Sequence, residues 1–122
     1  MDTVSIVIPT YNRNRSLERA LASALAQQQT CGSVSLEIIV VDNSPDGNAA
    51  AIVAAHAGGP VAVRSLHEPK TGVANARNAG VAAAQGRWVA FLDDDEEASP
   101  DWIARLTETA RATGADAVFG PV

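Results

Sequence analysis

Three consecutive aspartates, Asp93-Asp94-Asp95, are the residues of this sequence whose type and spacing most directly suggest chemistry. They follow the mostly apolar segment 87–92, and the next basic residue after them is Arg105. Carboxylates packed this closely repel one another unless a cation or solvent screens them. Mg²⁺ and Mn²⁺ prefer oxygen ligands, and Asp93 and Asp95 are close enough in sequence to turn toward one ion. The run therefore favours a divalent-metal site over a solvated acidic turn at the start of a helix.

Polar residues that could contact a ligand also follow the other apolar segments. They are Pro9, Thr10, Tyr11 and Arg13 after the first segment, Asp42 after the second, and Arg77 within a later helical segment. Asp42 can accept hydrogen bonds from a base or a ribose, although Asp-Asn-Ser is also typical of turns. Arg77 can pair with a diphosphate through its planar guanidinium, or lie on the surface as arginines usually do. Tyr11 and Arg13 can contact a nucleoside, or simply cap the helix that follows.

The segments between these polar groups predict an alternating α/β fold. Apolar runs predict strands at 4–8, 36–41, 61–66, 87–92 and 117–119. Periodic alanine-rich runs predict helices around 47–56, over 73–85 and after Ser99-Pro100, and a further helical face is formed by Leu17, Ala20, Leu21, Ala24 and Leu25. Nearly continuous apolar strands are typical of parallel sheets covered on both faces. We therefore expect a Rossmann-like open, mostly parallel sheet flanked by helices.

Three details of these helices can be checked directly. Gly86 is expected to stop the helix over 73–85, and Gly80 to let that helix approach the sheet closely. Ser99 and Pro100 are expected to be the N-cap and the first residue of the last helix. The buried face of that helix is predicted to be Trp102, Ile103, Leu106 and Ala110.

The predicted topology explains why the polar residues matter together. In an open parallel sheet, ligands bind beyond the carboxyl ends of the strands, near the point where the strand order reverses. Polar residues follow four of the predicted strands, and all of these positions lie at that same edge. Their coincidence is a stronger signal than any single motif.

Composition limits the classes of function. A chain of 122 residues forms one domain, and its net charge of −5 argues against a nucleic-acid partner. The single cysteine, Cys31, allows neither an internal disulfide nor a multi-cysteine zinc site and fits a reduced, cytoplasmic setting. His56 and His67 lack metal-ligand spacing and are interpreted as surface residues. The start of the chain does not resemble a signal peptide, and no apolar stretch reaches the ~20 residues of a membrane span.

Four segments of the chain resemble family 2 glycosyltransferases of the GT-A fold. The segments are 7–13 (VIPTYNR), 37–44 (EIIVVDNS), 72–80 (GVANARNAG) and 90–95 (AFLDDD), the last followed by Pro100-Asp101-Trp102. Each segment is common alone, but together they cover nearly the whole chain in the order and spacing of the family. The resemblance implies an inverting transfer of a sugar from a nucleotide-diphosphate sugar to an acceptor hydroxyl, assisted by Mn²⁺ or Mg²⁺.

The resemblance also implies a role for each matching residue. By this resemblance, Pro9, Thr10, Tyr11 and Arg13 line the nucleotide pocket, Asp42 contacts the base, Arg77 faces the nucleotide or diphosphate, and Asp93-Asp94-Asp95 is the DxD motif. Within that motif, Asp95 meets the metal and Asp93 lies near the ribose or the metal. The acceptor is expected to be a sugar, a lipid or a polysaccharide.

One part of the family pattern has no match in this sequence. The family's general base lies in an acceptor-binding half well beyond the DxD motif, so we expect it beyond Val122. Residues 1–122 are thus interpreted as the donor-binding part of a domain shortened at its C-terminus. We expect any peripheral membrane attachment to come from missing parts, and the last strand offers an edge for self-association.

Three alternatives remain at this point. The chain could be a nucleotide-binding module without catalysis, which sequence alone does not separate from a donor-binding half. A receiver-like signalling domain would need a lysine after its last strand, and no lysine follows Lys70. A nucleotidyltransferase would need a glycine-rich basic loop after the first strand, whereas segment 9–13 contains no glycine.

Overall fold

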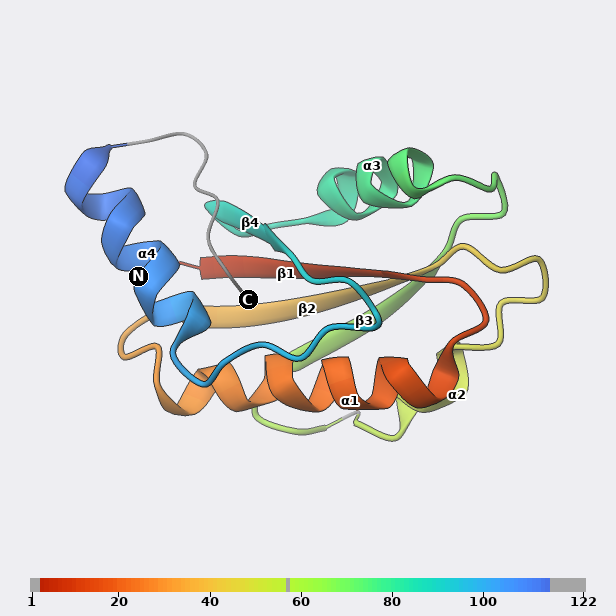
Figure 1. The fold of residues 1–122 in the computed structure, drawn as a ribbon, viewed down its shortest axis with the longest axis horizontal. Helices are drawn as coiled ribbons and strands as arrows, with labels where there is room; N and C mark the ends of the chain where they lie inside the picture. The colour runs from red at the N-terminus through yellow and green to blue at the C-terminus, as the bar shows by residue number, and fades with distance from the viewer. Residues whose placement is uncertain (1–2, 57, 115–122) are drawn as a thin grey trace.

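A four-stranded parallel sheet with helices on both faces forms the fold (Figure 1). The computed structural model describes residues 3–56 and 58–114. The strands are β1 (Thr3–Thr10), β2 (Ser35–Asp42), β3 (Ala62–His67) and β4 (Trp88–Phe91). The helices are α1 (Asn14–Leu25), the 3₁₀ helix η1 (Ala26–Gln29), α2 (Ala50–Ala54), α3 (Val73–Ala83) and α4 (Trp102–Thr113). The strand order is β3-β2-β1-β4, so the expected open parallel α/β architecture is confirmed.

The central strands β1 and β2 are buried on both faces, which explains their nearly continuous apolar sequences. Ile6 and Ile8 pack in the larger core cluster, which includes the buried face of α1. Val7 packs with Ile39 and Val41 in a smaller cluster that includes Ala76 of α3. Figure 1 shows α1 and α2 on one side of the sheet and α3 on the other. Alternation along each strand therefore assigns every side chain to one helical layer.

Helix α3 lies very close to the sheet. A Cβ atom placed on Gly80 would lie 2.4 Å from Cγ1 of Val7 and 3.3 Å from Cγ2 of Val41. Real side chains do not approach this closely, so this crossing requires glycine. The expectation that Gly80 permits a close approach is confirmed.

The prediction that Gly86 stops this helix is wrong. α3 ends at Ala83, and the next residue, Ala84, is already extended. Gly86 instead lies against β1, where a Cβ atom would be 2.6 Å from Ser5 Oγ and 2.9 Å from the carbonyl oxygen of Thr3. Its lack of a side chain serves strand packing rather than helix termination.

The prediction for the start of the last helix is also wrong. α4 begins at Trp102 with Asp101 as its N-cap, and the Ser99 carbonyl only accepts a turn hydrogen bond from the Trp102 N–H (3.0 Å). Buried Gln27 supplies the missing cap, because its Oε1 accepts the Ile103 N–H (3.0 Å) and its Nε2 donates to Ser99 O (2.8 Å). A cap from so distant a residue cannot be recognised from the local sequence.

The remaining differences concern boundaries and packing. The helix expected around 47–56 is shorter, at Ala50–Ala54, and the third strand is shifted by one residue, at Ala62–His67. On α4, Trp102, Ile103 and Ala110 are buried as predicted, Leu106 is partly buried against the core, and Thr107 is buried in addition. The strand predicted at 117–119 lies outside the described residues.

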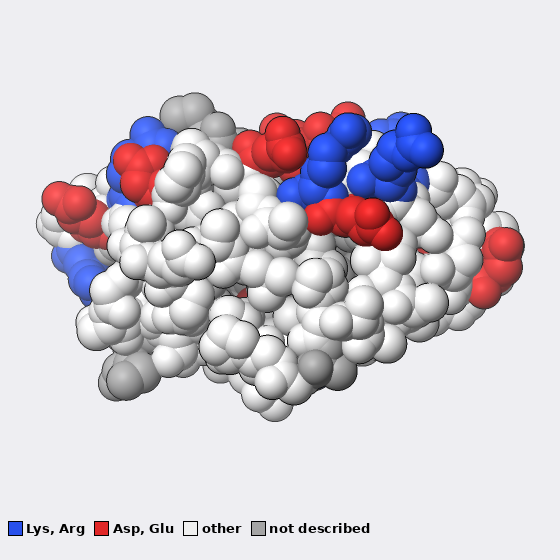
Figure 2. All heavy atoms as spheres, turned by 90° about the horizontal axis from the view of Figure 1, so that it is seen from below, with Lys and Arg blue, Asp and Glu red and all other residues white. Residues whose placement is uncertain are grey.

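The surface around α1 mixes acidic and basic side chains. In Figure 2, blue and red groups lie next to one another, and a broad area of this face carries no charge. Among the residues that the structure describes, no helix has the length and apolar character needed to cross a membrane.

Candidate functional site

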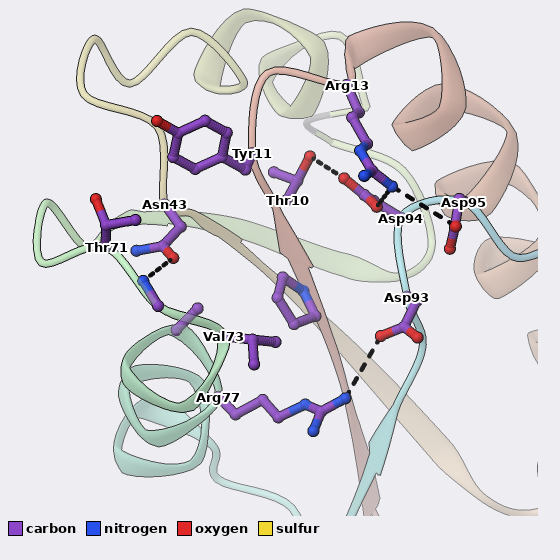
Figure 3. Close-up of a pocket in the computed structure, with 13 residues that line it drawn as sticks. Thr10, Tyr11, Arg13, Asn43, Thr71, Val73, Arg77, Asp93, Asp94 and Asp95 are labelled. Carbon is purple, nitrogen blue, oxygen red and sulfur yellow. Dashed lines mark hydrogen bonds and ion pairs between the residues drawn. The ribbon is translucent and has the colours of Figure 1, made fainter.

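A pocket of about 510 Å³ opens beyond the carboxyl ends of β1, β2 and β4, beside the start of α3 (Figure 3). Its lining includes all of the predicted site residues except Asp42. These are Pro9, Thr10, Tyr11, Arg13, Arg77, Asp93, Asp94 and Asp95. Asn43, Thr71, Gly72, Val73 and Ala76 complete the lining. Parallel pairing brings the strand ends together, as the register of Thr10 with Asp42 shows.

The pocket has one charged end. The Arg77 guanidinium lies 3.5 Å from Asp93 Oδ1. The Arg13 guanidinium lies 3.6 Å from both Asp94 Oδ1 and Asp95 Oδ2. Most of these side chains are half exposed, so each pair contributes little to stability. Two arginine side chains therefore lie beside three carboxylates, at an end of the pocket that is open to solvent.

Asp94 differs from its two neighbours because it is buried. Its side chain is 10% exposed, against 49% for Asp93 and 59% for Asp95. Thr10 Oγ1 donates a hydrogen bond to Asp94 Oδ2 (2.9 Å), which ties the end of β1 to the loop after β4. Asp94 therefore supports the loop, and the flanking aspartates are left to face a ligand.

The two exposed aspartates turn toward different arginines, Asp93 toward Arg77 and Asp95 toward Arg13 (Figure 3). In the described part of the chain, no group of three or more His, Cys, Asp or Glu residues is arranged to hold a metal. A site of one or two carboxylates still fits Mg²⁺ or Mn²⁺, because these ions complete their coordination with water and phosphate oxygens. The chemistry of these donors is therefore compatible with a divalent cation that takes most of its ligands from elsewhere.

Arg77 has the surroundings of a side chain that can change partners. Its guanidinium carbon lies 5.5 Å from the centre of the Phe91 ring, so the side chain packs beside that ring. Its Nε atom is enclosed and has no hydrogen-bond partner among the described residues. An unsatisfied buried donor is costly, so a ligand oxygen that reached Nε would offset that cost.

Asp42, which is predicted to contact the base, is buried at the end of β2. It is 2% exposed and is not among the described residues that line the pocket. Its carboxylate accepts hydrogen bonds from the Ser44 N–H (2.9 Å), the Ser44 hydroxyl and the Ala49 N–H (2.7 Å). Burial raises the pKa of Asp42, but these hydrogen bonds outweigh burial and the net pKa is lowered. These are the contacts of a turn-forming aspartate, and contact between Asp42 and a base stays a prediction.

Asn43 is the pocket residue that sequence reasoning missed. It follows Asp42 directly, is 5% exposed and lines the pocket. Strand alternation was the available signal: Ile39 and Val41 face α3, and Asn43 continues that series, whereas Asp42 belongs to the opposite face. The alternation of side chains between the two faces of the sheet therefore places Asn43 on the α3 side.

The other end of the pocket is uncharged. Figure 3 shows Tyr11, Asn43 and Thr71 together on the side away from the aspartates. Tyr11 is 43% exposed, so its ring is free to stack on a planar group. One pocket thus combines an uncharged end with an end rich in arginine and aspartate.

Comparison with known proteins gives a consistent family match. A family described as "Glycosyl transferase family 2" matches residues 5–122. The chain is 40% identical over 112 residues to the succinoglycan biosynthesis protein ExoO of Rhizobium meliloti, which covers 92% of this chain and 31% of that protein. It is 38% identical over 120 residues to ExoM of the same organism, covering 98% of this chain and 38% of that protein. The chain spans about a third of the length of these relatives.

Solved structures resemble the fold over most of this chain. The mannosyltransferase PcManGT from Pyrobaculum calidifontis, in complex with GDP-Man and Mn²⁺, has a TM-score of 0.74 and 28% identity, over 88% of this chain and 32% of its own. S. aureus TarS 1–349 in complex with UDP-GlcNAc has a TM-score of 0.69 and 25% identity, over 90% of this chain and 31% of its own.

Proposed function

Because the chain belongs to glycosyl transferase family 2, we propose that its pocket binds the nucleotide-diphosphate sugar from which a sugar is transferred. In this proposal residues 1–122 are the donor-binding part of a GT-A glycosyltransferase domain. The observation that carries it is the division of one pocket into a neutral end and an end where Arg13 and Arg77 lie beside the three aspartates. Relatives of known structure bind GDP-Man with Mn²⁺ and UDP-GlcNAc.

The two ends of the pocket suggest the orientation of the donor. The base and ribose are placed against Tyr11, Asn43 and Thr71, where a flat neutral group meets no charge. The diphosphate is placed beside Arg77 and Arg13, because guanidinium groups pair well with phosphate oxygens. Both arginines then exchange a half-exposed carboxylate partner for phosphate.

Release of the arginines frees the aspartates for their proposed role. A divalent cation held by Asp95, with Asp93 beside it, would supply Lewis-acid stabilisation of the departing nucleoside diphosphate. Asp94 keeps its hydrogen bond from Thr10 throughout and holds the loop in place. Removal of the cation is therefore expected to weaken nucleotide binding strongly.

The acceptor side of the reaction belongs to the proposal as well. We assign the acceptor a sugar, lipid or polysaccharide hydroxyl that attacks the anomeric carbon in line, so that the configuration inverts. The general base is assigned to the acceptor-binding part of the longer relatives, because in this proposal Asp94 is committed to Thr10 and Asp93 and Asp95 are committed to the divalent cation. The base would take the proton of the attacking hydroxyl.

Calorimetric titration with UDP, GDP and dTDP, each with and without Mn²⁺, tests the proposal. One nucleoside diphosphate is expected to bind, with at least ~10-fold higher affinity when Mn²⁺ is present. Asp95→Ala is expected to abolish the effect of the metal. Asp101→Ala is the matched control, since Asp101 is a similarly exposed aspartate paired with Arg105 outside the pocket.

Two results would contradict this assignment. The first is a folded chain that binds none of the three nucleotides. The second is an equal loss of binding in Asp95→Ala and Asp101→Ala, which would show that the effect is not local to the pocket. Turnover in a protein that includes the acceptor-binding part then separates a transferase from a module that only binds nucleotide.

A further inference from the structure

The side-chain amide of Asn43 is connected to three points of one loop. Its Nδ2 donates hydrogen bonds to the carbonyl oxygens of Glu68 (2.7 Å) and Lys70 (3.0 Å). Its Oδ1 accepts a hydrogen bond from the Gly72 N–H (3.0 Å). Because the residue is buried, these hydrogen bonds are shielded from water. The end of β2 is thus joined to the whole of the β3–α3 loop.

Only an amide satisfies this arrangement. Asn offers two donor hydrogens and an acceptor oxygen, and the loop presents two carbonyls and one N–H. An aspartate at position 43 would keep the acceptor but place a negative oxygen against the carbonyls of Glu68 and Lys70. Glutamine would extend the amide by one methylene, away from all three partners.

The loop that Asn43 holds forms the wall of the uncharged end of the pocket. Thr71 and Gly72 line the pocket next to Asn43. Gly72 has φ 136°, a conformation that other residues rarely adopt, and its carbonyl accepts the Ala76 N–H (3.1 Å) at the start of α3. The amide of Asn43 therefore fixes an unusual backbone shape beside the site.

The charged end is positioned by other contacts. Helix α3, which bears Arg77, is packed onto the sheet through Ala76 and Gly80. The acidic loop is tied to β1 by the hydrogen bond between Thr10 and Asp94. Loosening the Glu68–Gly72 loop should therefore disturb one end of the pocket and spare the other.

We propose that Asn43 is a positioning residue for donor binding, which fixes the loop against which the base and ribose lie. This inference rests on the proposed function of the pocket. Its specific content is that Asn43 controls affinity for the nucleoside part and leaves affinity for the diphosphate part nearly unchanged. Besides lining the pocket itself, the residue acts through the loop, by means of its hydrogen bonds to Glu68, Lys70 and Gly72.

The test compares two ligands on the same variants. Wild type, Asn43→Ala and Asn43→Asp are titrated with the nucleoside diphosphate that binds wild type, in the presence of Mn²⁺, and separately with Mn²⁺ and inorganic pyrophosphate. Both variants are expected to lose affinity for the nucleoside diphosphate by at least about tenfold. For Asn43→Ala, the pyrophosphate affinity is expected to stay within about twofold of wild type. Asn78→Ala, on the exposed side of α3, is the matched control and should bind both ligands as wild type does.

Amide hydrogen exchange supplies a readout that does not depend on any ligand. Exchange at the Gly72 N–H should accelerate at least about tenfold in Asn43→Ala, because this amide loses its acceptor. Retained pyrophosphate binding shows at the same time that the variant is folded.

Several outcomes would overturn the inference. An equal loss of affinity for the nucleoside diphosphate and for pyrophosphate would mean that Asn43 supports the fold in general. A variant that keeps full affinity for the nucleoside diphosphate would mean that the amide is dispensable. Absence of nucleotide binding by wild type would instead refute the proposed function itself. In that case accelerated exchange at Gly72 would still show that Asn43 holds the loop, but the loop would have no role in donor binding.

Discussion

At the scale of single residues, the three aspartates show how one residue type acquires different tasks. Asp94 is buried and hydrogen-bonded to Thr10, whereas Asp93 and Asp95 are half exposed and pair with arginines at 3.5 and 3.6 Å. A long ion pair in solvent contributes little, so either exposed carboxylate can change partners at low cost. A buried acceptor cannot, because its lost hydrogen bond would not be replaced by water.

Stability measurements separate these tasks. Asp94→Ala should lower the free energy of unfolding by about 1–3 kcal/mol, because it leaves the Thr10 hydroxyl without its buried partner. Asp95→Ala should change it by less than about 0.5 kcal/mol, because that side chain is exposed. Urea denaturation followed by circular dichroism gives both values. Equal destabilisation by the two substitutions would contradict the division of roles.

At the scale of elements, α3 is the part of the fold that most directly shapes the site. It begins at the loop held by Asn43, lies against β1 and β2, and presents Arg77 to the pocket. Its contact with the sheet is possible because Gly80 has no side chain. The position of Arg77 therefore depends on a residue that does not touch the pocket.

Gly80→Ala tests this dependence. The added methyl group would overlap Val7, which is fully buried and cannot move aside, so the substitution should destabilise the chain by about 1–3 kcal/mol despite the better helix propensity of alanine. Gly59→Ala is the control, since its nearest contact would be an ordinary 3.5 Å. The measurement is the urea midpoint of each variant. A neutral Gly80→Ala would show that the helix can shift without cost.

A second set of contacts joins elements near the amino ends of the strands, opposite the pocket. Buried Glu37 accepts hydrogen bonds from Ser5 Oγ (2.5 Å), the Gln85 N–H (2.6 Å) and the Arg64 guanidinium (2.9 Å). Arg64 also donates to the Ala83 carbonyl (2.8 Å) at the end of α3. Burial raises the pKa of Glu37, but these hydrogen bonds and the charge of Arg64 outweigh burial and lower it overall. The far end of α3 is thus fastened by a carboxylate.

Glu37 should make stability depend on pH in acid. A lowered folded-state pKa means that its stabilisation is fully present above the unfolded value of about 4.3 and is lost as the pH falls through the lower folded-state value. Glu37→Gln should therefore cost on the order of 1–3 kcal/mol at neutral pH, and the difference from wild type should shrink below about pH 4. Glu108→Gln, at an exposed position on α4, is the control. A difference that stays constant from pH 7 to pH 3 would contradict this role.

At the scale of the whole molecule, the carboxyl ends and the amino ends of the strands serve different purposes. The pocket lies beyond the carboxyl ends of the strands. The connection from α3 to β4 lies near their amino ends, beside Glu37 and Gly86. Ligand binding in the pocket should stabilise the entire chain, because the sheet unfolds as a unit and only the folded state contains the pocket.

Thermal unfolding with nucleotide measures this coupling. At a nucleotide concentration about 100 times Kd, with Mn²⁺ present, the free energy of unfolding should rise by about 2.7 kcal/mol and Tm should rise accordingly. Chelation of the metal should remove most of the increase while leaving the Tm of the nucleotide-free chain unchanged. An increase in Tm that survives chelation would contradict metal-dependent binding.

The sequence alone determined the fold class and most of the site. Apolar periodicity located the strands and helices, since burial on one or two faces leaves a direct trace in residue order. Parallel topology then placed the polar residues after each strand at one edge, where Thr10, Arg77 and Asp93 indeed line one pocket. These conclusions depend on local patterns, which a sequence records completely.

The tertiary structure decided what depends on contacts between distant residues. Gln27 caps α4 from another element, Gly86 packs against β1, and Asn43, directly after β2, lines the pocket while Asp42 is buried beside it. It also showed that Asp93 and Asp95 face different arginines. Residue type and spacing state which bonds a side chain can form, but only the packed chain selects the partners, because many arrangements satisfy the same local pattern and burial leaves one of them.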